Sequence, residues 1–222
     1  MNIKVNGVSK SFERPDGTNI DVLKKVDISL EKGEVLKLNG ASGTGKSTLL
    51  NIISGLLLPD SGSVVINDTE VNSLKESQRD KFRAANVGYI FQTFNLLSPF
   101  NVMENVYAPS AFAGILKPGF KEKAIEILKE VGLEGHEKNM PFHLSVGQRQ
   151  RVAVARVLFS QYPIILADEP TASLDKVSSE TVLSSLKKCR DNGSTVIFAS
   201  HDPIFDSLKP DKVFDLEKGG LL

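Results

Sequence analysis

The stretch that organises this sequence is LKLNGASGTGKSTLL, residues 36–50. Its centre matches the pattern G-x-x-x-x-G-K-[ST], known as the P-loop, at Gly40, Gly45, Lys46 and Ser47. The apolar residues before it are typical of a short buried strand, and those after it have helical spacing. We therefore expect a strand, a glycine-rich turn and a helix that together bind a phosphate group.

Each residue type in this stretch is suited to phosphate binding for a chemical reason. Glycines allow a tight backbone curl, so that successive N–H groups point at phosphate oxygens. Lys46 supplies a positive charge for the β- and γ-phosphates of a nucleotide, and the Ser47 hydroxyl suits Mg²⁺. The expected nucleotide-binding residues are Gly40, Ala41, Ser42, Gly43, Thr44, Gly45, Lys46, Ser47 and Thr48. The alternative is a glycine-rich turn that contains a lysine by chance.

The whole chain has 222 residues, which is enough for one large α/β domain or two closely packed lobes. Lys+Arg and Asp+Glu balance at 27 each, so we expect no nucleic-acid partner. The single cysteine, Cys189, excludes an intramolecular disulfide and falls on an apolar helical stripe, where we expect it to be buried. No run approaches the ~18 apolar residues of a membrane span, so we expect a cytoplasmic protein.

Alternating apolar residues over positions 2–38 predict a small antiparallel sheet before the P-loop. Phe12 falls within it. Its ring either packs into the core of that sheet or stacks on an adenine base. Further along, an apolar strand at 87–91 ends at Gln92. A glutamine oxygen at a strand exit can bind Mg²⁺ or the attacking water, although an isolated glutamine there is more often a surface residue.

A helical insert follows, which we expect to span residues 93–160 and to pack against a nucleotide-binding core formed by 1–92 and 161–222. It ends with LSVGQRQR, residues 144–151, in which Ser145 is a good N-cap for a helix over 146–160. This helix start is a second anion-binding site. One P-loop already accounts for one ATP, so the second site indicates either a rearranged pocket or a second molecule.

The next strand, IILADEP at residues 164–170, ends in a pair of carboxylates. Asp168 is placed to hold the Mg²⁺ shell, and Glu169 can accept a proton from water aligned on the γ-phosphate. The alternative is an acidic surface turn. A further buried strand at 195–198 leads to His201, which could hydrogen-bond a γ-phosphate oxygen, although a lone histidine is usually structural.

Taken in order, these motifs resemble the nucleotide-binding domain of ABC ATPases over essentially all 222 residues. The resemblance implies a single α/β domain: a P-loop NTPase core with a mostly parallel sheet, an N-terminal antiparallel β-subdomain and an inserted α-helical subdomain. The short sequence FQTFNLL at residues 91–97 is most similar to the lipoprotein-release and macrolide-efflux branch of that family.

The resemblance also implies roles. Phe12 would be the aromatic A-loop residue, Gln92 the Q-loop residue, Glu169 the general base and His201 the switch histidine. Two such domains would enclose two ATP molecules head to tail. The residues expected to reach the partner's ATP are Ser145, Val146, Gly147 and Gln148, with Asp175 of the D-loop across the dimer.

One position departs from the family pattern. Val146 replaces the first glycine of the usual L-S-G-G-Q. A β-branched residue disfavours positive φ, so we expect ordinary helical backbone there. Its N–H would stay available, but its methyl groups would crowd an approaching phosphate.

The expected activity is that of a transport-coupled Mg-ATPase. Its partners would be ATP, a second copy of the chain and a separate integral membrane permease, docked through residues 93–106, at the inner face of the membrane. That segment could instead pack within the helical lobe. Other hypotheses are a regulatory ABC ATPase that gates a membrane complex, a DNA-repair ABC ATPase and, least favoured, a nucleotide kinase.

Overall fold

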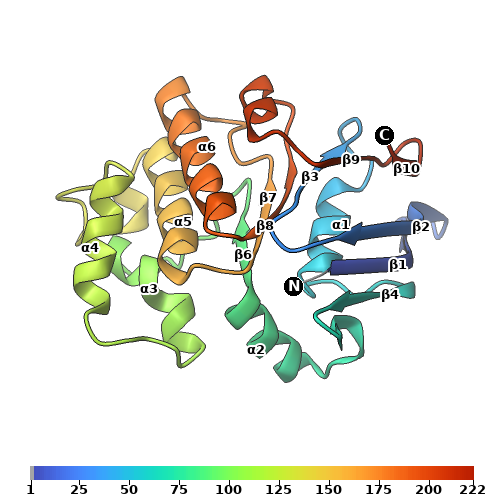
Figure 1. Ribbon diagram of the computed structural model, residues 1–222, viewed down its shortest axis with the longest axis horizontal. Helices are drawn as coiled ribbons and strands as arrows, with labels where there is room; N and C mark the ends of the chain where they lie inside the picture. The colour runs from blue at the N-terminus through green and yellow to red at the C-terminus, as the bar shows by residue number, and fades with distance from the viewer. Residues whose placement is uncertain (1–2) are drawn as a thin grey trace.

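The structure, a computed structural model, describes residues 3–222 and contains two sheets with helices packed on them (Figure 1). The smaller sheet is antiparallel and has the strand order β2-β1-β4-β5. Alternating apolar residues point from it into the core, as the sequence predicts. Its strands are β1 (Ile3–Glu13), β2 (Asn19–Leu30), β4 (Ser61–Ile66) and β5 (Thr69–Glu70).

The larger sheet has the strand order β10-β9-β3-β8-β7-β6 and is parallel except for the pair of β9 and β10. Its central strands are apolar runs buried on both faces, which is typical of parallel sheets covered by helices. This confirms the α/β fold class. Its strands are β3 (Val35–Asn39), β6 (Val87–Ile90), β7 (Ile164–Asp168), β8 (Thr195–Ala199), β9 (Lys212–Asp215) and β10 (Gly220–Leu221).

Helices cover both faces of this larger sheet (Figure 1). Helix α1 lies between the two sheets and shares one apolar core with them. Helices α3, α4, α5 and α6 build a second core on the opposite face. The helices are α1 (Lys46–Ile53), α2 (Glu76–Asn86), α3 (Val102–Phe112), α4 (Phe120–Glu130), α5 (Val146–Ser160) and α6 (Lys176–Asp191), with short 3-10 turns η1 (Val71–Ser73), η2 (Pro141–His143) and η3 (Pro203–Leu208).

The parallel strands determine where the site forms. The carboxyl ends of parallel strands meet at one edge of a sheet, and ligands of open α/β sheets bind at that edge. Four segments named from the sequence leave the sheet there: the P-loop after β3, Gln92 after β6, Asp168 at the end of β7 and His201 after β8.

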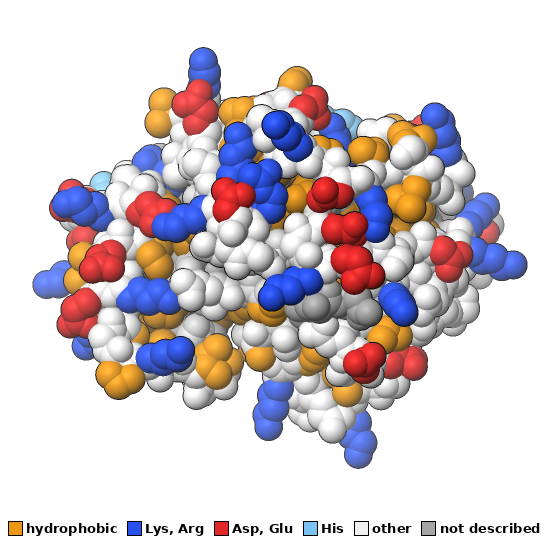
Figure 2. Space-filling view, in the orientation of Figure 1, with side chains coloured by type: hydrophobic (Ala, Val, Ile, Leu, Met, Phe, Trp, Pro, Cys, Tyr) orange, Lys and Arg blue, Asp and Glu red, His pale blue; other side chains and the backbone are white. Residues whose placement is uncertain are grey.

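The surface carries no extensive field of one charge on the face seen in Figure 2, where Lys and Arg side chains alternate with Asp and Glu. This agrees with the balanced composition. Over residues 3–222, no helix has both the length and the apolar character that a membrane span requires.

Cys189 provides a test of the packing between the helical layers. It lies on α6 within the core shared with α4 and α5 and is only 6% exposed, as the sequence predicts. Burial raises the pKa of its thiol to about 11. The thiol therefore stays protonated at pH 8, and thiolate is the reactive form. We expect the native protein to react slowly with a thiol reagent at pH 8 and rapidly once denaturant is added. Rapid stoichiometric labelling of native protein would contradict this packing.

Candidate nucleotide-binding site

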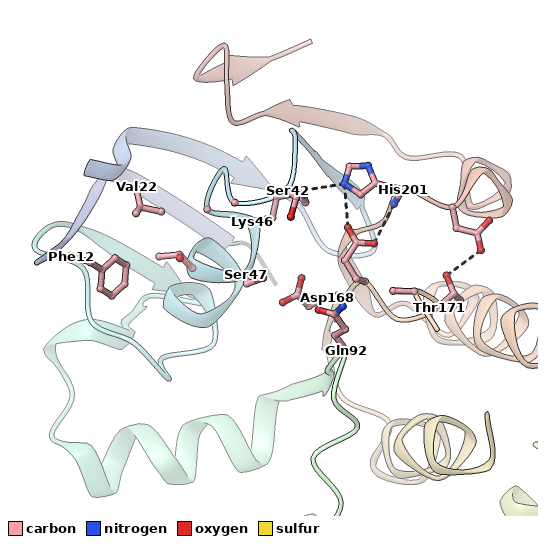
Figure 3. Close-up of a pocket in the computed structure, with 15 residues that line it drawn as sticks. Phe12, Val22, Ser42, Lys46, Ser47, Gln92, Asp168, Thr171 and His201 are labelled. Atoms are coloured by element: carbon pink, nitrogen blue, oxygen red, sulfur yellow. Dashed lines mark hydrogen bonds and ion pairs between the residues drawn. The ribbon is translucent and has the colours of Figure 1, made fainter. Parts of the chain in front are cut away.

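A cavity of about 760 Å³ opens at the carboxyl edge of the parallel sheet (Figure 3). The P-loop forms one wall, and the ends of β6, β7 and β8 form the opposite wall. The structure thus brings together most of the residues named from the sequence. Those that line the cavity are Phe12, Ser42, Gly43, Gly45, Lys46, Ser47, Thr48, Gln92, Asp168, Glu169 and His201.

The P-loop keeps its shape because glycine is required at specific positions. Gly45 has φ of +100°, and a Cβ there would lie 2.8 Å from the Cγ1 of Val22. Helix α1 begins directly after it, and no side chain caps its first N–H groups. These N–H groups and the positive end of the helix dipole are therefore available to an anion in the cavity.

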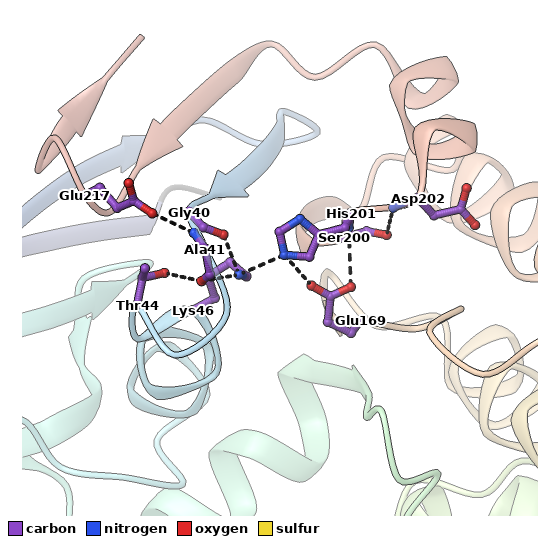
Figure 4. A network of polar contacts seen from close by, with 9 residues as sticks. All are labelled: Gly40, Ala41, Thr44, Lys46, Glu169, Ser200, His201, Asp202 and Glu217. Carbon is purple, nitrogen blue, oxygen red and sulfur yellow. Dashed lines mark hydrogen bonds and ion pairs between the residues drawn. The ribbon is translucent and has the colours of Figure 1, made fainter.

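Lys46 is the buried cation of the site. It is only 7% exposed, and its Nζ donates hydrogen bonds to the carbonyl oxygens of Gly40 (2.7 Å) and Ala41 (3.0 Å). The same Nζ lies 3.3 Å from His201 Nε2, as Figure 4 shows. A buried charge requires such partners. Phosphate oxygens entering the cavity would replace neutral partners with charged ones.

Glu169 and His201 form a pair on the opposite wall (Figure 4). The His201 backbone N–H donates to Glu169 Oε2 at 3.3 Å, and His201 Nε2 lies 3.5 Å from Glu169 Oε1. The backbone of Glu169 is unusual, with φ of +42°, and its N–H donates to the Ala199 carbonyl at 2.9 Å. The polar pair thus lies at the point where β7 and β8 end together.

Asp168 and Gln92 lie side by side at the base of the cavity, facing Ser47 (Figure 3). Their donor set consists of a carboxylate, an amide oxygen and a hydroxyl, which suits a hard cation such as Mg²⁺. No cluster of three or more His, Cys, Asp or Glu side chains that could hold a metal by itself occurs within residues 3–222. The charge of Asp168 also adds to burial in raising the pKa of nearby Tyr89.

Phe12 lies at the far end of the cavity from the carboxylates (Figure 3). Its side chain is 40% exposed, so the alternative of core packing for this residue is wrong. Val22 lies close to Phe12 along the same wall. An apolar end that faces a polar end suits a ligand with a flat base and a charged tail.

Several residues around the cavity carry no signal in the sequence. Thr171 and Asp202 line it and are joined by a hydrogen bond from Thr171 Oγ1 to Asp202 Oδ2 at 3.1 Å. Glu217 accepts a 2.7 Å hydrogen bond from the Ala41 N–H at the start of the P-loop (Figure 4). Only the turn between β9 and β10 brings Glu217 there, so no local motif could have indicated it.

The LSVGQ segment lies outside this cavity. Ser145 caps α5 as predicted: its Oγ accepts from the Gln148 N–H at 3.2 Å, and Gln148 Oε1 accepts from the Ser145 N–H at 2.9 Å. Val146 takes its place in the first turn of α5 and is 38% exposed. The expectation of helical backbone at Val146 is therefore confirmed. This helix start does not line the cavity of its own chain, and its service to a second molecule stays a prediction.

Asp175 also lies outside the cavity, where it caps helix α6. Its Oδ1 accepts from the Ser178 N–H at 2.8 Å, and its Oδ2 accepts from the Ser178 hydroxyl at 3.0 Å. These hydrogen bonds hold the pKa of the Asp175 carboxyl below its usual value. Gly147 of α5 packs against this cap: a Cβ on Gly147 would lie 2.5 Å from Ser178 Oγ. The sequence suggested a role for Asp175 across a dimer, and that role stays a prediction.

We expect Gly147→Ala to destabilise the protein by about 1–2 kcal/mol, because the added methyl displaces the Ser178 hydroxyl from Asp175. Alanine is otherwise the better helix former. Urea unfolding measures the change. The double variant Gly147→Ala/Ser178→Ala makes room for the methyl and should recover part of the loss. Gly220→Ala, where a Cβ meets nothing within 4 Å, is the control. An unchanged midpoint for Gly147→Ala would contradict the close packing.

The sequence and the fold both match known proteins. The family model described as ABC transporter matches residues 23–172. The chain is 43% identical to the ABC transporter ATP-binding protein YtrE of Bacillus subtilis, over 99% of this chain and 96% of that protein. It is 41% identical to the lipoprotein-releasing system ATP-binding protein LolD of Bacteroides thetaiotaomicron, over 90% of each chain.

Two further matches extend this result. The macrolide export ATP-binding/permease protein MacB of Mannheimia succiniciproducens is 42% identical over 90% of this chain, which spans only 31% of that protein. A solved structure titled as a dimeric post-hydrolysis state of the ATP-binding cassette MJ0796, bound to ADP and Pi, superposes with a TM-score of 0.89. It is 36% identical and covers 98% of this chain and 95% of its own. The chain therefore belongs to the ABC transporter family of ATP-binding proteins, in the branch that includes LolD and MacB.

Proposed function

We propose that two copies of this chain bind two Mg-ATP molecules head to tail, and that hydrolysis drives a membrane permease. The observation that carries this proposal is the separation of two half-sites on one chain. The cavity holds the P-loop, Asp168 and Glu169, whereas the anion-binding start of α5 at Ser145 faces elsewhere. A second copy in head-to-tail orientation would place each α5 start over the other copy's cavity.

The arrangement within the cavity supports a specific division of labour. Lys46 and the first N–H groups of α1 would bind the β- and γ-phosphates. Phe12 would stack on the adenine. Mg²⁺, held by Ser47, Asp168 and Gln92, would neutralise the charge that develops on the phosphates.

Glu169 would act as the general base on the attacking water. His201 adjoins Glu169 within the cavity and is exposed enough to reach a γ-phosphate oxygen, since 60% of its side-chain surface is accessible. Glu169 would thus remove the proton from water beside His201, which would contact the γ-phosphate that the water attacks.

ATP would hold the pair of subunits together electrostatically. The Ser145 hydroxyl and the N–H groups of the first turn of α5 would contact the γ-phosphate bound to the other copy. Val146 would crowd this contact without removing its N–H groups. Cleavage would remove the bridging charge and release the two subunits.

A groove between the sheet and the helical layer is the proposed docking surface for the permease. It has a volume of about 290 Å³ and a mainly apolar lining that includes Leu56, Phe91, Leu97 and Phe112. Phe112 is 69% exposed, which is rarely favourable for an unpartnered phenylalanine. Such a groove suits an amphipathic helix from another chain. Docking would place the protein at the cytoplasmic face of the membrane.

Only part of the expected docking segment 93–106 can take this role. Leu97 lines the groove, but Val102, Asn105 and Val106 are buried within the helical layer. The amide of Asn105 fixes the segment by accepting from the Leu97 N–H (2.7 Å) and donating to the Leu97 carbonyl (3.0 Å). Val102, Asn105 and Val106 therefore pack within the helical layer, as the alternative interpretation stated.

We expect Glu169→Gln to keep ATP binding, to reduce turnover to a trace and to form an ATP-dependent dimer, because the bridging phosphate is then removed only very slowly. Light scattering with and without Mg-ATP measures the mass, and phosphate release measures turnover. Glu126→Gln, an exposed residue of α4, is the matched control and should behave as the original protein. Normal hydrolysis by Glu169→Gln would remove Glu169 as the base, and an ATP-bound monomer would contradict pairing of the isolated chain.

We expect Lys46→Ala to weaken ATP binding by about 10- to 100-fold, which corresponds to the loss of a charge-assisted hydrogen bond of about 1.5–3 kcal/mol. Isothermal titration calorimetry measures the affinity directly. Lys24→Ala removes an equally charged side chain that is exposed and outside the cavity, and it should leave the affinity unchanged. Undiminished affinity in Lys46→Ala would overturn the P-loop assignment.

A further inference from the structure

A buried glutamine joins helix α5, which begins at the LSVGQ segment, to the segment that carries Glu169. Gln150 lies on α5, one turn after Gly147, and is only 1% exposed. Its Nε2 donates a 2.7 Å hydrogen bond to the carbonyl oxygen of Pro170. Pro170 directly follows Glu169 in the chain. A single side-chain hydrogen bond therefore connects helix α5 to the peptide that follows Glu169.

This bond acts at a point where the backbone is strained. Glu169 has φ of +42°, a region that non-glycine residues rarely occupy, and the proline after it restricts its backbone further. Strained backbone persists only where the surroundings hold it in place. Two backbone hydrogen bonds contribute: Glu169 N–H to the Ala199 carbonyl (2.9 Å) and Ala172 N–H to the Glu169 carbonyl (3.2 Å). The Gln150 amide adds the side-chain restraint, on the adjoining peptide.

The chemistry at Gln150 requires a donor as well as bulk. The Pro170 carbonyl accepts a hydrogen bond from the Gln150 amide nitrogen. The amide oxygen, Oε1, is buried without a hydrogen-bond partner among the described residues. A reversed amide would bring two oxygens together, so a single bond sets the orientation of the side chain. A residue of equal size that cannot donate would fill the space and leave the carbonyl unpaired.

A second contact fixes α5 to the part of the chain that follows Glu169. Gly147, at the start of α5, packs so closely on the α6 cap that a Cβ would lie 2.5 Å from Ser178 Oγ and 3.3 Å from Asp175 Oδ2. The segment from Glu169 to Ser178 is thus fixed to α5 near both of its ends. A displacement of α5 would be passed to Glu169 through packed and hydrogen-bonded groups.

We propose that Gln150 is a positioning residue that holds Glu169 in its strained backbone and links the base of one ATP site to helix α5, which serves the other. This inference rests on the head-to-tail pair proposed above. Engagement of α5 by the partner's ATP would then determine how well Glu169 is placed on water in its own cavity.

Gln150→Met keeps the length of the side chain but removes the donor. We expect kcat to fall by about 10- to 100-fold with KM for ATP within about twofold, because a misplaced base slows the chemical step without altering phosphate binding. Gln161→Met, an exposed glutamine just after α5, is the matched control and should show original kinetics. A kcat unchanged in Gln150→Met would overturn the proposal.

A double-mutant cycle separates positioning from general damage. If Gln150 acts through Glu169, then Gln150→Met should cause no further loss of the residual turnover in the Glu169→Gln background. ATP-dependent pairing of the double variant, measured by light scattering, should also persist. Additive losses, or a loss of pairing, would overturn the proposal. If Glu169→Gln alone fails to pair or hydrolyses ATP at the original rate, the proposed function is wrong, whatever Gln150 does.

The pH dependence of the variant Gln150→Glu distinguishes a donor role of Gln150 from a purely structural role. A carboxyl in this buried place has a raised pKa, and its protonated form can donate to the Pro170 carbonyl. The activity of Gln150→Glu relative to the original protein should therefore rise as pH falls, whereas the relative activity of Gln150→Met should stay flat. Parallel pH profiles for the two variants would contradict a donor role.

Discussion

The register of the parallel strands is the constraint on which the rest of the site depends. Leu38 of β3 and Asp168 of β7 both pair with Ala199 of β8, so the three strands end level with one another. Evenly spaced backbone hydrogen bonds fix this alignment, and apolar burial on both faces prevents a slip. The P-loop, the paired carboxylates and His201 therefore reach one edge together, from three separate parts of the chain.

Electrostatics at that edge follow from this geometry. Positive groups lie on the P-loop side, as Lys46 and the uncapped start of α1, and carboxylates lie on the β7 side. In the proposed function, a nucleoside triphosphate with its cation would complement both walls. The dipoles and charges are set by the fold before any ligand arrives, and such preorganisation lowers the energy needed to rearrange them during reaction.

The start of helix α5 at Ser145 lies outside the cavity, and the proposed head-to-tail pair rests on this separation. Helix α5 is part of the same core as the sheet, yet its capped start does not line the cavity of its own chain. In the proposed coupling, the core would transmit a displacement of α5 to the segment of Glu169, because packed interiors do not deform continuously. Gln150 and Gly147 contact the segment that follows Glu169, at Pro170 and at Ser178 respectively.

The sequence by itself determined the P-loop, the N-cap at Ser145, the strand that ends in Asp168 and Glu169, and the fold class. The three local features depend on periodicity, capping or backbone chemistry within a short stretch, whereas the fold class was implied by the resemblance of the whole motif order to ABC ATPases. Only the tertiary structure decided the contact of Glu217 with the P-loop, the exposure of Phe12, the burial of Asn105 and the bond from Gln150 to Pro170. These depend on how distant segments pack, which no local pattern encodes.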